Sequence, residues 1–261
     1  MLTIVTALPW EAAAFTSRLR ARRRIALGPA SDSTAWALRG TRGGLQLRLI
    51  VSGPGEDRAQ AAARALADLD PPATGILSTG VAGALDPALS PGALVLATRI
   101  QHRRAGSGRR GLPIAATPHF RDWLHTSLTS AGLTPASGDI LSRDAILRSA
   151  ADKAEALKQT RSVAVQMEDY LWAEHAAEIG IPFASLRAIL DPASATLPPE
   201  IEAWDPSRPS AAAVTSALLR RPTLALALPK LAWQRRKAVR SIDRALEAIV
   251  AAGSPPPESD S

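Results

Sequence analysis

Short apolar runs rich in β-branched residues alternate with helical patterns along most of the chain. The run at 2–8, LTIVTAL, is typical of a buried strand, because residues of this kind favour an extended, covered backbone. Further strands are predicted over 33–39, 45–51, 75–79, 94–100, 139–142 and 182–190, and helices over 10–23, 56–69, 117–131 and 144–158, with one more helix that ends at Gly180. Strands that alternate with helices predict an α/β protein whose sheet is covered by helices on both faces.

The pattern changes after the last predicted strand. Residues 195–209 hold four prolines and predict an ordered loop or lid. Residues 210–250 predict basic amphipathic helices that are interrupted at Pro222 and Pro229. The tail, 251–261, has the proline- and serine-rich composition of a disordered segment. The expected organisation is one domain over 1–250 followed by this tail.

The composition excludes several classes of protein. The chain has no cysteine, which rules out disulfide scaffolds, thiolate metal sites and cysteine nucleophiles. Its four histidines are scattered without metal-ligand spacing, so no metal site is expected. No apolar run reaches the roughly eighteen residues of a membrane span, and the first residues lack the basic start of a signal peptide. A cytoplasmic protein is therefore expected.

The chain is basic, with a net charge of +7 at pH 7, and this favours an anionic partner. Nucleic acid is not expected as the partner, because aromatic residues are only 4% and no RNA-binding motif is present. The segment from Arg208 to Arg244 carries nine Lys or Arg and one acid, among leucines and Trp233, which is compatible with peripheral contact with an anionic inner membrane. A solvated basic helix face or a basic surface between subunits explains the same pattern.

Polar or glycine-rich features follow several predicted strands, where ligands bind in open α/β sheets. They are Glu11, Ser52–Gly55, Thr79–Ala84, Gln166–Glu168 and Asp191. None has the spacing of a dinucleotide fingerprint or a Walker A loop. Each also has a local explanation: an acid near a helix start is favourable by itself, and an aspartate before a proline can simply begin a turn.

Four segments, taken together, resemble the purine nucleoside phosphorylase and uridine phosphorylase superfamily. They are LTIVTALPWEAAAF, LIVSGPGEDRAQAAARAL, ILSTGVAGALDPALSPGALVLAT and VAVQMEDYLWAEHAAEIGIPFASLRAILDPA. The third is the most specific, since it is similar to the family's "TGxAGGLxPxLxxGDxVxxT" segment. The resemblance implies a single-domain, three-layer nucleoside phosphorylase-like fold with a mixed central sheet. It also implies a small nucleoside substrate and a homo-oligomer.

The resemblance assigns roles to the residues at the strand ends. Asp191 matches the acid that protonates N7 of a purine leaving group, and Glu168 with Met167 matches the ribose cradle. Glu11 matches the carboxylate that activates water in the nucleosidases, which favours hydrolysis. The remaining substrate-binding positions that it implies are Gln166, Thr79, Gly80 and Gly53.

The C-terminal third is similar to the hopanoid-associated phosphorylases, in LRAILDPASATLPPEI and ALLRRPTLALALPKLAWQRRKAVRSIDRAL. This implies release of adenine from adenosylhopane, a lipidic nucleoside. A soluble methylthioadenosine or adenosylhomocysteine nucleosidase is the alternative enzyme. A non-catalytic nucleoside-binding protein on the same fold is an alternative of another class.

The chain departs from the superfamily pattern at several positions. Leu190 stands where a serine could orient the acid, and Gln166 stands where an acidic or other polar residue often precedes Met-Glu. Phosphorylases often place an arginine and a serine around the glycine segment, where this chain has Ser78 and Val81. The basic stretch 103–111, expected to be a mobile loop, offers other arginines: Arg103, Arg104, Arg109 and Arg110. Phosphate therefore stays open as a co-substrate, and no other cofactor is expected.

Overall fold

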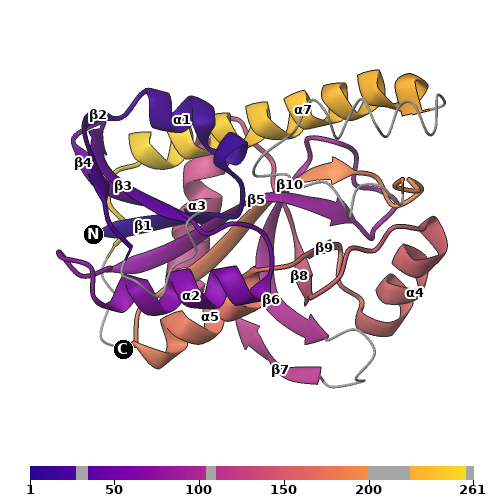
Figure 1. Cartoon of the computed structure of the whole chain (residues 1–261), viewed down its shortest axis with the longest axis horizontal. Helices are drawn as coiled ribbons and strands as arrows, with labels where there is room; N and C mark the ends of the chain where they lie inside the picture. The colour runs from indigo at the N-terminus through magenta and orange to yellow at the C-terminus, as the bar shows by residue number, and fades with distance from the viewer. Residues whose placement is uncertain (28–34, 104–109, 199–223, 257–261) are drawn as a thin grey trace.

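The computed structural model describes residues 1–27, 35–103, 110–198 and 224–256, and its strands form one sheet (Figure 1). The strands are β1 (Leu2–Thr6), β2 (Arg20–Ile25), β3 (Trp36–Arg42), β4 (Leu45–Val51), β5 (Gly75–Ala84), β6 (Leu94–Arg103), β7 (Arg110–Ala115), β8 (Ala136–Arg143), β9 (Ala164–Gln166) and β10 (Phe183–Asp191). The helices are η1 (Pro9–Glu11), α1 (Ala13–Ser17), α2 (Glu56–Ala67), α3 (Pro118–Ser130), α4 (Ala150–Thr160), α5 (Asp169–Glu178) and α7 (Leu224–Ala251).

The sheet is mixed, as the resemblance predicts. Strand β1 runs parallel to β4 and β5, and β5 runs parallel to β10, whereas β10 pairs antiparallel with β6. The order is β10-β6-β8-β9-β5-β1-β4-β3-β2, with β7 paired to β6. Because β10 also pairs with β5, the strands β5, β10, β6, β8 and β9 close into a ring. The parallel strands β1, β4, β5 and β10 all end on the same side of the sheet.

Helices cover both faces of the sheet and give the three layers that the resemblance implies (Figure 1). One core cluster joins the sheet to α1, α3 and α7 through side chains such as Phe15, Phe120 and Leu246. The second cluster joins the opposite face to α2 and α5, where Leu66 and Trp172 are almost fully buried. This arrangement confirms the predicted α/β fold class.

The helix predicted over 10–23 is wrong in its second half. The chain forms only η1 and the short helix α1 there, and the arginine-rich residues Arg20–Ile25 form strand β2. Strand β2 pairs antiparallel with β3 and is the last strand of the sheet. An exposed, charged edge strand resists further pairing with other chains, and its pairing with β3 outweighs the helical preference of arginine.

The C-terminal region forms one long helix in its described part. Helix α7 continues through Pro229, so that proline does not end the helix as predicted. A proline costs a helix one hydrogen bond, and packing of α7 against β10, α3 and β5 compensates for it. Residues 199–209 of the loop or lid predicted over 195–209, residues 210–223 with Pro222, and the tail from 257 lie outside the described residues. Within the ranges given above, no helix is long and apolar enough to cross a membrane.

Candidate active site

A cavity of about 370 Å³, here called the strand-end cavity, lies where several strands end. The turn after β1 contributes Leu8, the turn after β4 contributes Gly55, and strands β5, β9 and β10 contribute residues at or near their C-terminal ends. Its walls are largely apolar, with Ala7, Leu8, Pro54, Val81, Ala82, Ala145, Ile146, Leu147, Val165, Met167, Leu190 and Leu197. The carboxylates among its lining residues are Glu11, Glu168 and Asp191, which are the three predicted from the sequence.

Glu11 is held at the end of η1 by the backbone. Its Oε2 accepts a hydrogen bond from the backbone N–H of Leu8 at 2.8 Å, and its Oε1 accepts one from that of Val81 at 2.8 Å. Burial raises the pKa of Glu11 to about 7, against the opposing effects of Arg187 and of these two N–H groups. A carboxylate with a pKa near neutrality can take up a proton in this range, which suits a general base.

Glu168 lies at the start of α5 and faces the same cavity. Its Oε1 accepts a hydrogen bond from the backbone N–H of Gly55 at 2.9 Å, and burial raises its pKa while Arg187 opposes this. The side chain of Gln166 holds the turn between β9 and α5: its Oε1 accepts from the N–H groups of Glu168 at 2.5 Å and Asp169 at 2.9 Å. Gln166 thus fixes the segment that presents Met167 and Glu168 to the cavity.

A buried arginine that the sequence analysis did not assign lies behind these acids. Arg187 of β10 is only 2% exposed and forms an ion pair with Asp169, and its Nη2 donates to Ser78 Oγ at 2.7 Å. Asp169 also accepts a hydrogen bond from Ser185 Oγ at 2.6 Å. The positive charge of Arg187 opposes the rise in the pKa of Glu11 and of Glu168. Arg187 has its ion pair with Asp169 and not with either of these two acids. We call Glu11, Glu168, Asp169 and Arg187 the Glu11 cluster.

Asp191 is held differently, by a lysine from α4. Lys153 is 1% exposed and forms an ion pair with Asp191 Oδ2. Burial raises the pKa of Asp191, and Lys153 opposes this effect. We call these two residues the Asp191 pair. A buried acid whose pKa is raised can stay protonated closer to neutrality, which suits a general acid.

Three predicted binding residues lie next to the strand-end cavity rather than in its lining. Thr79 is buried in β5, and its hydroxyl donates to the carbonyl oxygen of Leu186 at 2.9 Å. Gly53 has φ +87° and its N–H donates to the carbonyl of Ala7, so it shapes the turn after β4. Gly80 has φ +147°, and a Cβ on it would lie 2.6 Å from Glu11 Oε1 and 2.7 Å from Arg187 Nη1. These residues shape the backbone and keep room for the Glu11 cluster.

Three residues of this region have no assigned role in the sequence analysis: Arg187, Lys153 and Gly55. The sequence could have indicated that Arg187 is functional, because it is the single charged residue in the apolar strand segment PFASLRAIL. Gly55 belongs to the glycine-rich segment Ser52–Gly55, and its N–H is the group that donates to Glu168 Oε1. The sequence does not indicate a role for Lys153, because the residues around it in the helix do not distinguish it from an exposed lysine.

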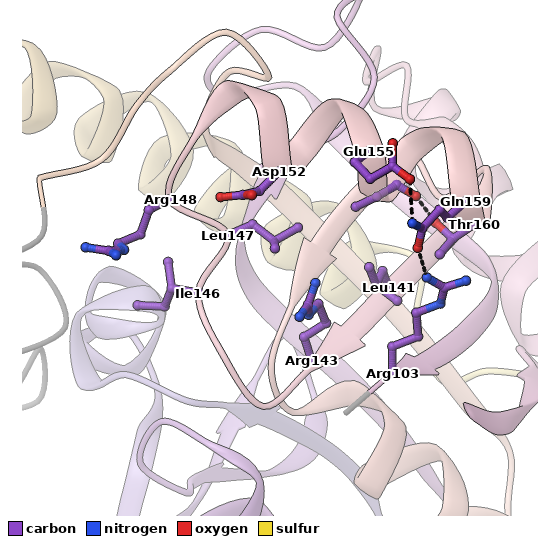
Figure 2. Close-up of a pocket in the computed structure, with 11 residues that line it drawn as sticks. Arg103, Leu141, Arg143, Ile146, Leu147, Arg148, Asp152, Glu155, Gln159 and Thr160 are labelled. Atoms are coloured by element: carbon purple, nitrogen blue, oxygen red, sulfur yellow. Dashed lines mark hydrogen bonds between the residues drawn. The ribbon is translucent and has the colours of Figure 1, made fainter. Parts of the chain in front are cut away.

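A second pocket, here called the α4 pocket, also measures about 370 Å³ and shares Ile146 and Leu147 with the strand-end cavity (Figure 2). Arg143 points into it, and Arg103 reaches across to Gln159 of α4. Arg103 is thus engaged here and does not line the strand-end cavity. Arg104 and Arg109 lie outside the described residues, and of Arg110 only the backbone is described. Within the described ranges, no cluster of three or more acids and histidines is placed to hold a metal ion.

Solved structures with the same fold cover nearly the whole chain. A 5′-methylthioadenosine/S-adenosylhomocysteine nucleosidase from Neisseria meningitidis, in complex with methylthio-immucillin-A, matches with a TM-score of 0.73 and 19% identity over 95% of this chain and 97% of that chain. The same kind of nucleosidase from Colwellia psychrerythraea, in complex with adenine, gives 0.73 and 15% identity over 96% and 94%. Futalosine hydrolase from Helicobacter pylori gives 0.74 and 17% identity over 96% and 97%.

The comparison with protein-family profiles agrees with the resemblance. Among curated proteins, none matches this chain significantly. The sequence profile of the phosphorylase superfamily matches residues 2–221, which include all the residues of the strand-end cavity. The chain therefore belongs to the phosphorylase superfamily.

Proposed function

We propose that this enzyme cleaves the N-glycosidic bond of an adenine nucleoside in the strand-end cavity. The observation that carries the proposal is the convergence of three buried carboxylates, Glu11, Glu168 and Asp191, from three different elements on one cavity. Cleavage of such a bond needs a proton for the leaving base, a negative group near the oxocarbenium-like sugar and an activated nucleophile. Three carboxylates in different surroundings can divide these tasks.

Each carboxylate takes the role that its surroundings favour. Asp191 donates its proton to N7 of adenine as the C1′–N9 bond breaks and its electron pair passes to the base. Glu168 accepts hydrogen bonds from the ribose hydroxyls and stabilises the positive charge that develops on the sugar. Glu11 accepts a proton from water as the water oxygen bonds to C1′. Met167 packs against the sugar from the same turn as Glu168.

Water is the nucleophile that the charges of the site favour over phosphate. The Glu11 cluster contains three carboxyl groups and one guanidinium, and the guanidinium of Arg187 is already paired with Asp169. A phosphate dianion placed beside this cluster would meet an excess of negative charge in a buried setting, where repulsion is strong. A neutral water molecule meets no such repulsion, and Glu11 can deprotonate it.

Adenosylhopane is the substrate that we propose, with methylthioadenosine or adenosylhomocysteine as the alternative. The largely apolar lining of the strand-end cavity and the resemblance of the C-terminal third support a lipidic 5′ substituent. The names of the neighbouring structures, methylthioadenosine/adenosylhomocysteine nucleosidases, support the soluble substrates. The two kinds of substrate differ only at the 5′ position, so the same chemistry serves either.

Helix α7 supports contact with a membrane that holds a lipidic substrate. Trp233 is 51% exposed, and Lys237 lies 4.2 Å from the centre of its ring. On another side of α7, Arg235 lies over Trp10 of η1, so the helix itself adjoins the short helix that carries Glu11. The exposed residues of the basic face that holds Trp233, within the described part of α7, are Lys230, Trp233, Arg236, Lys237, Arg240 and Arg244. A basic helix face with an exposed tryptophan binds anionic lipid surfaces.

Adenine release tests the proposal. The purified protein is incubated with adenosylhopane in anionic vesicles and, separately, with methylthioadenosine, each with and without phosphate, and adenine is measured by chromatography. We expect adenine from adenosylhopane at a rate that phosphate does not raise. Adenine from methylthioadenosine alone would replace the lipidic substrate with a soluble one. If neither substrate releases adenine, the result would favour the alternative hypothesis that the protein binds nucleosides without cleaving them.

Vesicle binding tests the membrane contact separately. Lys230→Glu with Arg236→Glu reverses two charges on the exposed face of α7, and we expect it to lower co-sedimentation with anionic vesicles. Arg64→Glu with Lys158→Glu is the matched control, because it reverses two exposed charges on α2 and α4. An equal loss in both double variants would indicate a general charge effect and no role for the α7 face.

A further inference from the structure

Lys153 is buried at a position where an ammonium group needs strong compensation. Its side chain is 1% exposed and lies on the buried face of α4. Figure 2 shows Asp152 and Glu155 on the face of α4 that lines the α4 pocket, whereas the Nζ of Lys153 bonds to Asp191 on β10. Moving an ammonium group out of water costs several kcal/mol unless charge and hydrogen bonds replace the water.

All three donors of the ammonium have acceptors. The Nζ of Lys153 donates to Asp191 Oδ2, to the carbonyl oxygen of Pro192 at 3.1 Å and to that of Ala195 at 3.2 Å. Three donors facing three oxygens is the full hydrogen-bonding capacity of a lysine ammonium. The contact with Asp191 is therefore part of a complete set that fixes the rotamer of the carboxyl.

Within the part of the chain that the structure describes, Lys153 is the one side chain that bonds to the Asp191 carboxyl. The preceding residue on β10, Leu190, is apolar and lines the cavity without a polar atom in its side chain. Gly83 lies on the other side of the carboxyl, where a Cβ would approach both Asp191 oxygens to 3.4 Å. The orientation of the acid thus depends on a residue from a different element, 38 positions away in the chain.

We propose that Lys153 is the positioning residue of the acid: it aims the Asp191 carboxyl into the strand-end cavity and stabilises the carboxylate that remains when the proton passes to the leaving base. This inference rests on the proposed function. The proton leaves Asp191 for N7, the electron pair of the C1′–N9 bond goes to the base, and the carboxylate forms beside an ammonium that is already in place. Solvent returns the proton to Asp191 after the products leave.

The charge of Lys153 acts on the proton affinity of Asp191. Burial raises the pKa of Asp191 and Lys153 lowers it. The other charged groups at the cavity are Glu11 from η1 and Glu168 at the start of α5, while Arg187 on β10 itself is paired with Asp169. Removal of the positive charge therefore raises the pKa of Asp191, and a reaction that needs the protonated acid persists to higher pH.

Two variants separate the charge of Lys153 from its role in tying α4 to the 192–195 segment. Lys153→Gln removes the charge but keeps an amide that can donate to a backbone carbonyl, and Lys153→Met removes both. Lys158→Met is the matched control, because Lys158 is an exposed lysine on the same helix. Thermal denaturation of each variant shows whether it is folded before its kinetics are compared.

The expected result is a change in both rate and pH profile. In Lys153→Gln and Lys153→Met, kcat for adenine release falls about tenfold or more, as part of the roughly 10²–10⁴ that general acid catalysis contributes. The alkaline limb of the kcat profile moves to higher pH in both variants, KM changes little, and Lys158→Met behaves as the wild type. An unmoved alkaline limb with only a lower melting temperature would overturn the proposal and make Lys153 a purely structural tie.

A second measurement does not depend on the proposed function. In protein with ¹³C-labelled aspartate, the Asp191 carboxyl resonance, assigned with Asp191→Asn, is titrated in the wild type and in Lys153→Gln. We expect Asp191 to titrate at higher pH in the variant. The same titration point in both proteins would overturn the proposal. A wild type that releases no adenine would refute the proposed function alone, because this titration still decides whether Lys153 governs Asp191.

Discussion

In the Glu11 cluster the cation does not bond to the acids that face the strand-end cavity, whereas in the Asp191 pair it does. Arg187 forms an ion pair with Asp169, whereas Glu11 and Glu168 accept hydrogen bonds from backbone N–H groups. Lys153 bonds directly to Asp191 and to two carbonyl groups beside it. Both arrangements bury carboxylates, but only in the Asp191 pair does a cation bond directly to the acid that faces the cavity.

This difference suggests how one cavity can hold a base and an acid. Neighbouring titratable groups take separate roles when their surroundings push their pKa values apart. Glu11, with a pKa raised by burial to about 7, can accept a proton near neutrality. When Asp191 loses its proton, the negative charge of its carboxylate is already paired with the ammonium group of Lys153. The reaction therefore leaves no unpaired charge buried at this position.

The largest expected effect is at Asp191. Asp191→Asn removes the proton donor and keeps the shape of the side chain, so adenine release should fall by at least about a hundredfold, in the range of general acid catalysis. The asparagine also leaves Lys153 without its carboxylate, so the melting temperature should fall as well. Chromatographic assay of adenine and thermal denaturation measure the two effects, and full activity in this variant would refute the assignment of the acid.

Glu11→Gln should give the next largest loss, about a hundredfold in kcat, because an amide cannot accept the proton of the attacking water. The amide also retains only one of the two acceptor oxygens that bind Leu8 and Val81. Glu174→Gln is the control, since Glu174 is an exposed acid on α5. Comparable losses in both variants would show that the assay responds to charge in general and would contradict a specific role of Glu11.

The pH profile separates the two groups in the wild-type enzyme. Glu11 works as a base only when ionised, and its pKa is about 7, so kcat/KM should fall as the pH drops below 7. Asp191 works as an acid only when protonated, so activity should also fall at higher pH. Steady-state adenine release from pH 5 to 9 measures both limbs. An acid limb that survives in the residual activity of Glu11→Gln would assign that limb to another group.

The strands of the central sheet were predictable because their signal is local. Buried parallel strands need continuous apolar runs, and 2–8 and 182–190 have them, so β1 and β10 form close to the expected positions. Strand β2 was missed because its arginines favour extended structure only through pairing with β3, which the local pattern does not encode. Tertiary pairing overrode propensity there.

The same distinction applies to the site. Glu11, Glu168 and Asp191 come together because they lie at or just beyond strand ends on one side of the sheet, and strand positions were predictable. Lys153 reaches Asp191 only because the fold brings α4 near the end of β10, and that placement cannot be inferred from the sequence of α4. Gly80 was predicted to bind substrate, but only the structure shows that its lack of a side chain leaves room for Glu11 and Arg187.

Gly80→Ala tests how closely the Glu11 cluster is packed and should have the smallest effect on activity. Its Cβ would lie 2.6 Å from Glu11 Oε1 and 2.7 Å from Arg187 Nη1, so both groups must move. Overpacking of this kind costs roughly 1–3 kcal/mol, and we expect a lower melting temperature with about a tenfold loss of kcat/KM. Gly132→Ala is the control, because Gly132 also has a positive φ, +71°, but has open space around it. If the two variants lose equal stability and neither loses activity, backbone conformation alone explains the glycine. A loss of activity confined to Gly80→Ala would show that the spacing between Glu11 and Arg187 is itself needed, because only that variant displaces the base from the cation that moderates its pKa.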